Sequence, residues 1–327
     1  MSSVLYDAPG PRTRIFTVVG SIVSVAGIAA AVYFWIYRPL DDAGQFDWKL
    51  WAPILDPANE SFPLVWERWR DGWLNTLKAA VLAIVASLVV GTLLALVRRS
   101  LRDLRRRHFP GWPRPAAGGL RTGVLAGRGL TRGWVEVARG TPVVVTILFV
   151  FLVLPDWGID FDDLIWFLVI GLTIYNSVVI GEILRSGMDG LPQGQEEAAR
   201  AVGLGSWQTS WLVLFPQAFR VMLPALISQV VVILKDTSLG FIISYEEAMR
   251  VTNQMVEAFR GLGIANGIPM YFTLGVMYIL VNYALSRLAI YIERRLSRRG
   301  YKPAEAGAIV EAEAGSGVAA PAPAEKA

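Results

Sequence analysis

A polar stretch between two long apolar segments of the chain reads Leu191-Pro192-Gln193-Gly194-Gln195-Glu196-Glu197-Ala198-Ala199-Arg200-Ala201-Val202-Gly203-Leu204-Gly205-Ser206. Pro192 and Gly194 mark an opening turn, and residues 196–202 are strong helix formers. Gly203 and Gly205 permit a sharp reversal, after which Ser206 can cap a second short helix. The stretch therefore predicts a rigid protrusion of two short helices on one aqueous side of the chain.

Composition places the rest of the chain in a bilayer, with membrane lipids as its surroundings. Of 327 residues, 54% are hydrophobic and 18% are charged, which is too apolar a balance for a soluble domain. The chain has no cysteine, which excludes disulfides, thiolate metal sites and thiol nucleophiles. Its one histidine, His108, stands among arginines without a second ligand nearby, so neither a metal site nor a catalytic residue is predicted.

Six apolar runs are long enough to cross the hydrocarbon core, which takes roughly 20 residues of helix. They cover residues 15–37, 73–97, 135–154, 164–184, 219–243 and 270–292. Helices are required because backbone amides inside lipid need hydrogen bonds within their own segment. The first run is longer than the apolar part of a signal peptide, so it is expected to remain uncleaved. The predicted fold class is all-α, a polytopic membrane helix bundle with six transmembrane helices.

The charges between these runs predict the orientation. Segment 98–132 holds ten arginines and one acid, Asp103, whereas residues 155–163 hold four aspartates and no base. Basic loops are typical of the cytoplasmic side, so both termini and the loop with Glu197 are predicted to be cytoplasmic in a multi-pass plasma-membrane protein. Segment 98–132 lacks the regular aromatic residues that stack bases, and a nucleic-acid partner is therefore not expected.

Three regions are predicted along the chain. Residues 1–72 comprise a cytoplasmic tail, an extra transmembrane helix and an outer segment rich in tryptophan; residues 73–292 form the core; residues 293–327 form a disordered cytoplasmic tail. Phe62, Trp66, Trp69 and Trp73 recur at helical spacing, which predicts a short helix on the outer leaflet. Such a helix either anchors the chain or offers a docking surface to an extracytoplasmic partner.

Several motifs of the core resemble the permeases of polar amino-acid importers in the ATP-binding cassette superfamily. Besides Glu197-Ala198-Ala199, Gly203 and Pro216, they are Arg139-Gly140-Thr141-Pro142, Gly181-Glu182-Ile183-Leu184-Arg185-Ser186-Gly187, Leu223-Pro224-Ala225-Leu226 and Leu234-Lys235-Asp236-Thr237-Ser238-Leu239. Phe215 departs from the family, which usually has leucine before this proline. The N-terminal Val4-Leu5-Tyr6-Asp7-Ala8-Pro9-Gly10-Pro11 is similar to actinobacterial glutamate-uptake permeases.

The resemblance implies the architecture of a type I importer permease and a set of partners. A cytoplasmic coupling loop at about 186–217 would dock on an ATPase subunit through Glu196, Glu197, Ala198, Ala199 and Gly203. A second permease subunit, homologous or identical, would complete the pore, and an extracytoplasmic amino-acid-binding protein would deliver the substrate. ATP and Mg would belong to the ATPase subunit, with no cofactor bound by this chain. In agreement, the chain has no Gly-rich Lys-Ser/Thr phosphate loop.

Polar residues inside the apolar runs are candidate functional residues, because they are costly in lipid unless they face protein or water. Near the cytoplasmic end, a structural ion pair is predicted among Arg139, Glu182 and Arg185. The predicted substrate pathway consists of Thr146, Tyr175, Asn176, Gln229, Lys235 and Asp236. For each pathway residue, a hydrogen bond between helices is the alternative. Thr237 and Ser238 are expected to satisfy backbone groups at a local break.

The predicted function is ATP-driven import of a polar amino acid, with glutamate as the expected substrate, by alternating access. The chain is expected to be a transporter subunit and not an enzyme. The alternative is a secondary carrier driven by an ion gradient, with Glu182, Lys235 and Asp236 as a relay. Such carriers usually show internal repeats, and the two halves of this chain show none that is convincing. An intramembrane hydrolase is disfavoured because no histidine lies in an apolar run.

Overall fold

The computed structural model describes residues 10–106 and 114–297, which are mostly helical and include no strand. The longer helices are α1 (Pro11–Val32), α4 (Phe62–Arg106), α5 (Arg114–Gly140), α6 (Val143–Asp156), α7 (Ile165–Asp189), α11 (Leu223–Asp236), α12 (Ala248–Gly261) and α13 (Gly267–Ser297). Shorter elements are the π-helix η1 (Tyr33–Tyr37), α2 (Arg38–Asp42), α3 (Trp48–Leu55), α8 (Gln193–Ala201), α9 (Ser206–Gln208), the π-helix η2 (Thr209–Leu214), α10 (Phe215–Val221) and the 3₁₀-helix η3 (Thr237–Ile243).

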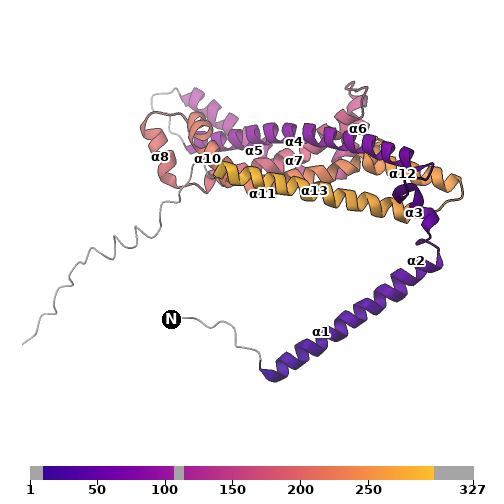
Figure 1. Ribbon diagram of the computed structural model, residues 1–327. Coiled ribbons are helices and arrows are strands. Elements are labelled where there is room, and N and C mark those ends of the chain that lie inside the picture. The colour runs from indigo at the N-terminus through magenta and orange to yellow at the C-terminus, as the bar shows by residue number, and fades with distance from the viewer. Residues whose placement is uncertain (1–9, 107–113, 298–327) are drawn as a thin grey trace, which may run out of the picture.

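The long helices other than α1 form one bundle. Figure 1 shows α4, α7, α11 and α13 along a common direction, with α8 and α10 at one end and α3 and α12 at the other. In the described part of the chain, five helices are long and apolar enough to cross a membrane, and the spans number up to six if the bent pair α5 and α6 counts as one. The predicted all-α membrane bundle is thereby confirmed. The predicted N-terminal tail, His108 and the part of the C-terminal tail after Ser297 lie outside the described residues, and α13 includes residues 293–297.

The arginine-rich segment 98–132 is helical wherever it is described, which corrects the expectation of a loop. α4 continues beyond its apolar run to Arg106, and α5 begins at Arg114. Arginine is a good helix former, so the end of hydrophobicity does not end the helix. A 45-residue helix is about 68 Å long, and α4 therefore extends well beyond a hydrocarbon core of about 30 Å.

The predicted span 135–154 is broken. α5 ends at Gly140, α6 begins at Val143, and their axes are bent by 108°. Pro142 occupies the N-cap of α6 with φ −58° and ψ 138°. Proline has no N–H to continue a helix and disfavours helical geometry at the residue before it, which explains the break.

The core lies between α4 and α7, where two glycines allow close approach. A Cβ on Gly91 would lie 2.7 Å from the carbonyl oxygen of Ser177, and one on Gly181 would lie 3.0 Å from that of Gly91. In lipid, the hydrophobic effect does not drive helices together. Small residues let the two helices approach closely, and the dispersion energy of this close packing then stabilises their contact. The surrounding core includes Leu96 and Leu172, both fully buried.

The tryptophan-rich segment begins α4 and is no separate helix on the outer leaflet, contrary to prediction. Trp69 is fully buried against Val251 and Met255 of α12, and its Nε1 donates to Thr252 Oγ1 at 2.9 Å. These aromatic residues therefore hold α12 on the bundle. They do so because tryptophan combines a large apolar surface with one donor that needs a partner.

Glu247 begins α12 from a fully buried position. Its carboxylate accepts hydrogen bonds from the backbone N–H groups of Met249 and Arg250, both at 2.8 Å, and from the hydroxyl of Tyr278 at 3.3 Å. Burial raises the pKa of this carboxyl group to about 7, because an apolar environment disfavours the charged form.

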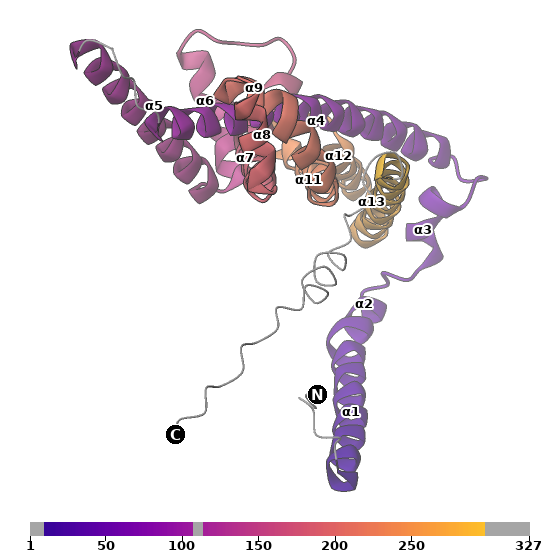
Figure 2. The ribbon, with the colours of Figure 1, turned by 90° about the vertical axis from the view of Figure 1, so that its left-hand side faces the viewer.

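Helix α1 stands apart from the bundle in both views, Figure 1 and Figure 2. None of its residues is buried. An apolar helix without protein neighbours is suited to lipid on all sides.

Candidate functional site: a protrusion at one end of the bundle

The polar stretch of the sequence folds into the turn and two short helices that follow α7. Pro192 occupies the N-cap of α8 with φ −54° and ψ 133°, so the chain enters the helix from an extended conformation. Glu196 lies in the first turn of α8 and Arg200 in its last turn, where each charge opposes the end charge of the helix dipole. The proline therefore sets where α8 begins, and the charges at the two ends of α8 stabilise the helix.

Gly203 ends α8 by a Schellman motif. The N–H of Gly203 donates to the carbonyl of Arg200 at 3.0 Å, and the N–H of Leu204 donates to that of Ala199 at 3.2 Å. The motif requires a left-handed residue after the helix, and Gly203 has φ +86°. Glycine is suited to this position because it has no Cβ to clash with the carbonyl oxygen.

The second helix begins differently from the prediction. Gly205 occupies the N-cap of α9, and its N–H donates to Oε1 of Gln208 at 2.9 Å. Ser206 is the first helical residue, and its buried hydroxyl has no partner among the described residues. Ser206 is therefore not the cap, since the chain reverses one residue earlier than expected.

Arg99 of α4 ties α8 to the bundle. Its guanidinium group donates both to Asp189, at the end of α7, and to Glu196 of α8. The side chain is only 7% exposed, so the charge is largely removed from water and depends on these two carboxylates. One arginine thereby joins three helices.

Further ion pairs surround this contact. Asp189 also pairs with Arg102 and Arg185, both at 2.8 Å, and Arg200 pairs with Asp103 at 3.3 Å. Sequence reasoning missed Arg99, Asp103 and Asp189. Arg99 and Asp103 are four residues apart on one helix face, and this spacing was a usable signal once α4 was known to continue past its apolar run.

The predicted coupling residues divide between two faces of α8. Glu196 and Ala199 face the protein, whereas Glu197, Ala198 and Gly203 are exposed. Exposed apolar side chains accompany them: Val202 at 76%, Trp207 at 45% and Trp211 at 44%. We call these exposed residues, Glu197, Ala198, Val202, Gly203, Trp207 and Trp211, the protrusion face. An apolar face on a water-facing protrusion is typical of a protein-binding surface.

Two predicted pathway residues lie in contact inside the bundle. Nε2 of Gln229, on α11, donates to Oδ1 of Asn176, on α7, at 2.6 Å, while Nδ2 of Asn176 donates to the carbonyl of Leu172 at 2.9 Å. Asn176 is fully buried. The contact has the form of a hydrogen bond between helices, which was the alternative for each of these residues.

The other predicted pathway residues are not joined to that pair by hydrogen bonds within the described part of the chain. Among the described residues, no hydrogen bond joins Thr146, Tyr175, Lys235 or Asp236 to Asn176 or Gln229, and Lys235 is exposed. The predicted break is present, since α11 becomes the 3₁₀-helix η3 at Thr237. Thr237 and Ser238 donate their hydroxyl groups to the carbonyls of Leu234 and Lys235, at 2.6 and 2.7 Å.

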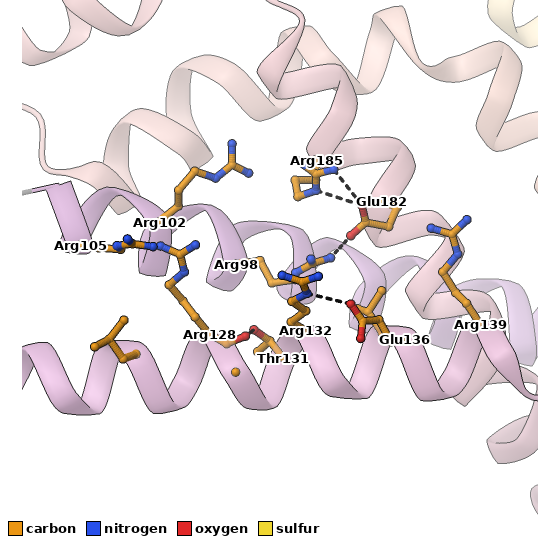
Figure 3. A pocket seen from close by; sticks show the side chains of 13 residues that line it. Arg98, Arg102, Arg105, Arg128, Thr131, Arg132, Glu136, Arg139, Glu182 and Arg185 are labelled. Carbon is orange, nitrogen blue, oxygen red and sulfur yellow. Dashed lines mark hydrogen bonds and ion pairs between the residues drawn. The ribbon is translucent and has the colours of Figure 1, made fainter.

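Of the three residues predicted to form an ion pair, Glu182 and Arg185 do pair, and Arg139 does not join them within the described residues. Glu182 pairs with Arg185 one turn away at 2.8 Å, and also with Arg98 of α4, which was not considered. Arg139 forms no ion pair with any residue that the structure describes. Figure 3 shows Arg139 on α5, to one side of the group formed by Glu182, Arg185 and Arg98.

Known proteins resemble this chain in both sequence and fold. Residues 119–298 match the protein family described as binding-protein-dependent transport system inner membrane component. The chain belongs to this family. The permease is 36% identical over 260 residues to the glutamate transport system permease protein GluD of Corynebacterium glutamicum, which covers 79% of this chain and 83% of GluD. It is 28% identical over 258 residues to the glutamate/aspartate import permease protein GltK of Escherichia coli, 77% and 98% of the two chains.

A solved structure described as an amino acid ABC transporter with histidines has the same fold. It aligns with a TM-score of 0.56 and 24% identity over 72% of the permease and 97% of the solved chain. The permease is therefore a subunit of an ABC amino-acid importer of the inner membrane, with the type I fold. It is not an enzyme, and ATP hydrolysis belongs to a separate subunit. The family implies an ATPase and a substrate-binding protein as partners.

Proposed function

We propose that this permease imports glutamate, and that an ATPase subunit docks on the protrusion face at the cytoplasmic end of the bundle. The identity of 36% with a glutamate permease over 79% of the chain is the observation that carries the choice of substrate. The excess of arginine at the α8 end supports a cytoplasmic location for that end and for both termini. ATP and Mg are bound by the ATPase.

We propose that ion pairs transmit the motion of the ATPase to the membrane helices. A displacement of α8 acts on Glu196, and through Arg99 on Asp189 of α7 and on α4 itself. Because α4 and α7 are tightly packed at Gly91 and Gly181, they move together. A second permease chain, homologous or identical, completes the substrate pathway, which lies between the two permease chains.

Transport by a reconstituted system tests the substrate. Proteoliposomes that contain the permease, its ATPase and a second permease chain would receive the cognate binding protein outside and ATP inside. We expect uptake of labelled glutamate that unlabelled glutamate suppresses more strongly than glutamine does, and that a protonophore leaves intact. Preferential uptake of glutamine would contradict glutamate as the substrate. Uptake that occurs without ATP and is abolished by the protonophore would favour the secondary carrier.

Cysteine labelling tests the orientation, and the natural chain needs no background substitution because it has no cysteine. Glu197→Cys lies on the protrusion face, and Asp160→Cys lies at the opposite end, between α6 and α7. A membrane-impermeant maleimide on intact spheroplasts should label Asp160→Cys and leave Glu197→Cys unlabelled until the cells are opened. The reverse pattern would place the protrusion outside and end the docking proposal.

We also propose Thr146, Tyr175, Asn176, Gln229, Lys235 and Asp236 as residues of the substrate pathway. Lys235 is exposed on α11 of the isolated chain, where its ammonium group can meet a carboxylate of the substrate. Lys235→Ala should raise the apparent KM for glutamate more than that for glutamine, which has an uncharged side chain. An unchanged ratio of the two KM values would remove Lys235 from the pathway.

A further inference from the structure

A cavity of about 650 Å³ opens between α4, α5 and α7 at the α8 end of the bundle. Figure 3 shows arginines from all three helices directed toward it. We call it the arginine cavity, and its charged lining is Arg98, Arg102, Arg105, Arg128, Arg132, Arg139, Arg185, Glu136 and Glu182. Neither the docking of an ATPase nor the proposed substrate pathway uses it.

Positive charge in the arginine cavity is only partly neutralised. Glu182 is shared by Arg98 and Arg185, Glu136 pairs with Arg132 at 2.7 Å, and Arg102 turns to Asp189 outside the lining. Within residues 10–106 and 114–297, three lining arginines form no ion pair: Arg105, Arg128 and Arg139. Like charges that share one cavity repel each other unless an anion joins them.

The chemistry of the lining favours a phosphate group. Its cations are all arginines, with no lysine among them. Guanidinium groups present a planar fork of donors that matches the oxygens of phosphate, and they can share one such group from several directions. A carboxylate has fewer oxygens than a phosphate group, so it is less able to accept hydrogen bonds from three separate guanidinium groups.

The position of the cavity matches the level of lipid headgroups. The apolar run of α4 ends at Val97, and Arg98, Arg102 and Arg105 occupy the turns that follow. Exposed apolar side chains lie near lining arginines along the same helices: Leu93 at 50% and Val97 at 39% precede Arg98 on α4, and Trp134 at 48% and Val137 at 65% lie between Arg132 and Arg139 on α5. Basic pockets between helices at this level are suited to anionic headgroups beside acyl chains.

We infer that the arginine cavity binds one phosphate-bearing anion, the headgroup of an anionic lipid from the leaflet on the α8 side. That this leaflet is the cytoplasmic one rests on the proposed orientation. Binding itself depends only on the lining. The lipid would bridge α5 to α4 and α7 and neutralise the arginines that form no ion pair with any described residue.

Native mass spectrometry of the purified importer in detergent tests this inference. The probes are phosphatidylglycerol, phosphatidylcholine and inorganic phosphate, and the test variant is Arg105→Gln combined with Arg128→Gln. Wild type should retain phosphatidylglycerol in preference to phosphatidylcholine. Because the double variant loses two arginines that each strengthen binding near a charged surface, it should bind phosphatidylglycerol at least about tenfold more weakly.

Two further variants make the outcome specific. Arg220→Gln removes an exposed arginine of α10 at the same end of the bundle, outside the lining, and should bind as wild type does. Arg128→Lys keeps the charge without the fork and should fall between wild type and double variant. Should the double variant not fold, as judged by size exclusion and its melting curve, Arg128→Lys and Arg128→Gln give the same comparison.

The outcomes with phosphatidylglycerol and with inorganic phosphate distinguish the source of the phosphate group. Retention of phosphatidylglycerol that millimolar inorganic phosphate does not displace supports the lipid. A rise of the melting temperature with inorganic phosphate in wild type and not in the variant, without lipid retention, supports the phosphate site and replaces the lipid by a soluble anion. Equal binding by wild type and double variant, an equal loss in Arg220→Gln, or no binding of either probe would overturn the inference. None of these readouts requires transport or ATPase docking.

Discussion

At the scale of single residues, backbone conformation distinguishes two glycines of the same loop. Gly194 and Gly203 both have open space where a Cβ would stand, but only Gly203 has a positive φ, 86°. The chain therefore needs glycine at Gly203 for conformational reasons and tolerates other residues at Gly194.

Gly203→Ala should consequently weaken ATPase docking. The left-handed conformation costs a non-glycine residue roughly 1–2 kcal/mol, so the Schellman motif becomes unstable and the protrusion face changes shape. Pull-down with a tagged ATPase should recover less of the variant at unchanged membrane insertion. Gly194→Ala is the matched control and should behave as wild type; equal losses in both variants would contradict the role of the conformation.

Glu247 predicts a pH dependence of stability. Its pKa is raised from 4.5 to about 7 in the folded protein, so between these pH values the folded state holds a proton that the unfolded state has released. The free energy of unfolding should therefore fall as pH rises from about 4.5 to 7 and level off above, by up to about 3 kcal/mol.

Melting curves between pH 4.5 and 8 measure this effect. Glu247→Gln keeps the side chain uncharged and should flatten the pH profile over that window. The neighbouring Glu246 is exposed, and Glu246→Gln should retain the slope of wild type. A wild-type slope in Glu247→Gln would assign the dependence to another group.

At the scale of elements, α8 depends on its attachments. Helices of nine residues are marginal in water by themselves, so the place of α8 is set by the contacts of Glu196 and Arg200 with α4. Arg99 is the central member, because among the described residues it alone joins α8 to both α4 and α7.

Arg99→Gln should destabilise this junction by about 3 kcal/mol, because two partly buried carboxylates lose their shared cation. Hydrogen exchange of the amides of residues 193–201 should accelerate accordingly. Arg102→Gln is the control, since Asp189 keeps Arg99 and Arg185 and the Arg102 side chain is 31% exposed; its effect should stay below about 1 kcal/mol. Similar exchange rates in the two variants would show that Arg99 is not the anchor.

At the scale of the whole molecule, α1 and the bundle are separable bodies. No residue of α1 is buried, and Figure 2 shows it away from every other helix of the bundle. The stability of the bundle should therefore not depend on α1.

Cleavage after purification tests this separation without disturbing membrane insertion. A protease site inserted between Val32 and Tyr33, at the end of α1, would release residues 1–32 and leave in place α2, whose Leu40 lines a cavity with α12. The melting temperature of the remaining bundle should be unchanged, and an uncleaved sample with the same insertion is the control. A clear fall after cleavage would reveal contacts of α1 that stabilise the bundle.

Much of the architecture could be read from residue types and spacing. Apolar runs of sufficient length required membrane helices, because no other structure satisfies backbone amides in lipid. Pro192, Gly203 and Gly205 placed the turns of the protrusion, since the allowed φ and ψ of proline and glycine are local properties. Family motifs then indicated an importer permease, which the match over residues 119–298 confirmed.

Contacts between helices could not be predicted from the sequence, because they depend on the rotation of each helix about its axis and on the identity of its neighbours. Arg98 rather than Arg139 meets Glu182, and Gln229 meets Asn176, only because α4, α7 and α11 lie together. The pairing of Arg99 and Asp103 with residues of α7 and α8 is likewise a tertiary result, since these partners come from other parts of the chain. Local chemistry therefore specified the helices and turns, while packing selected which charges became paired and left three arginines of one cavity without a partner among the described residues.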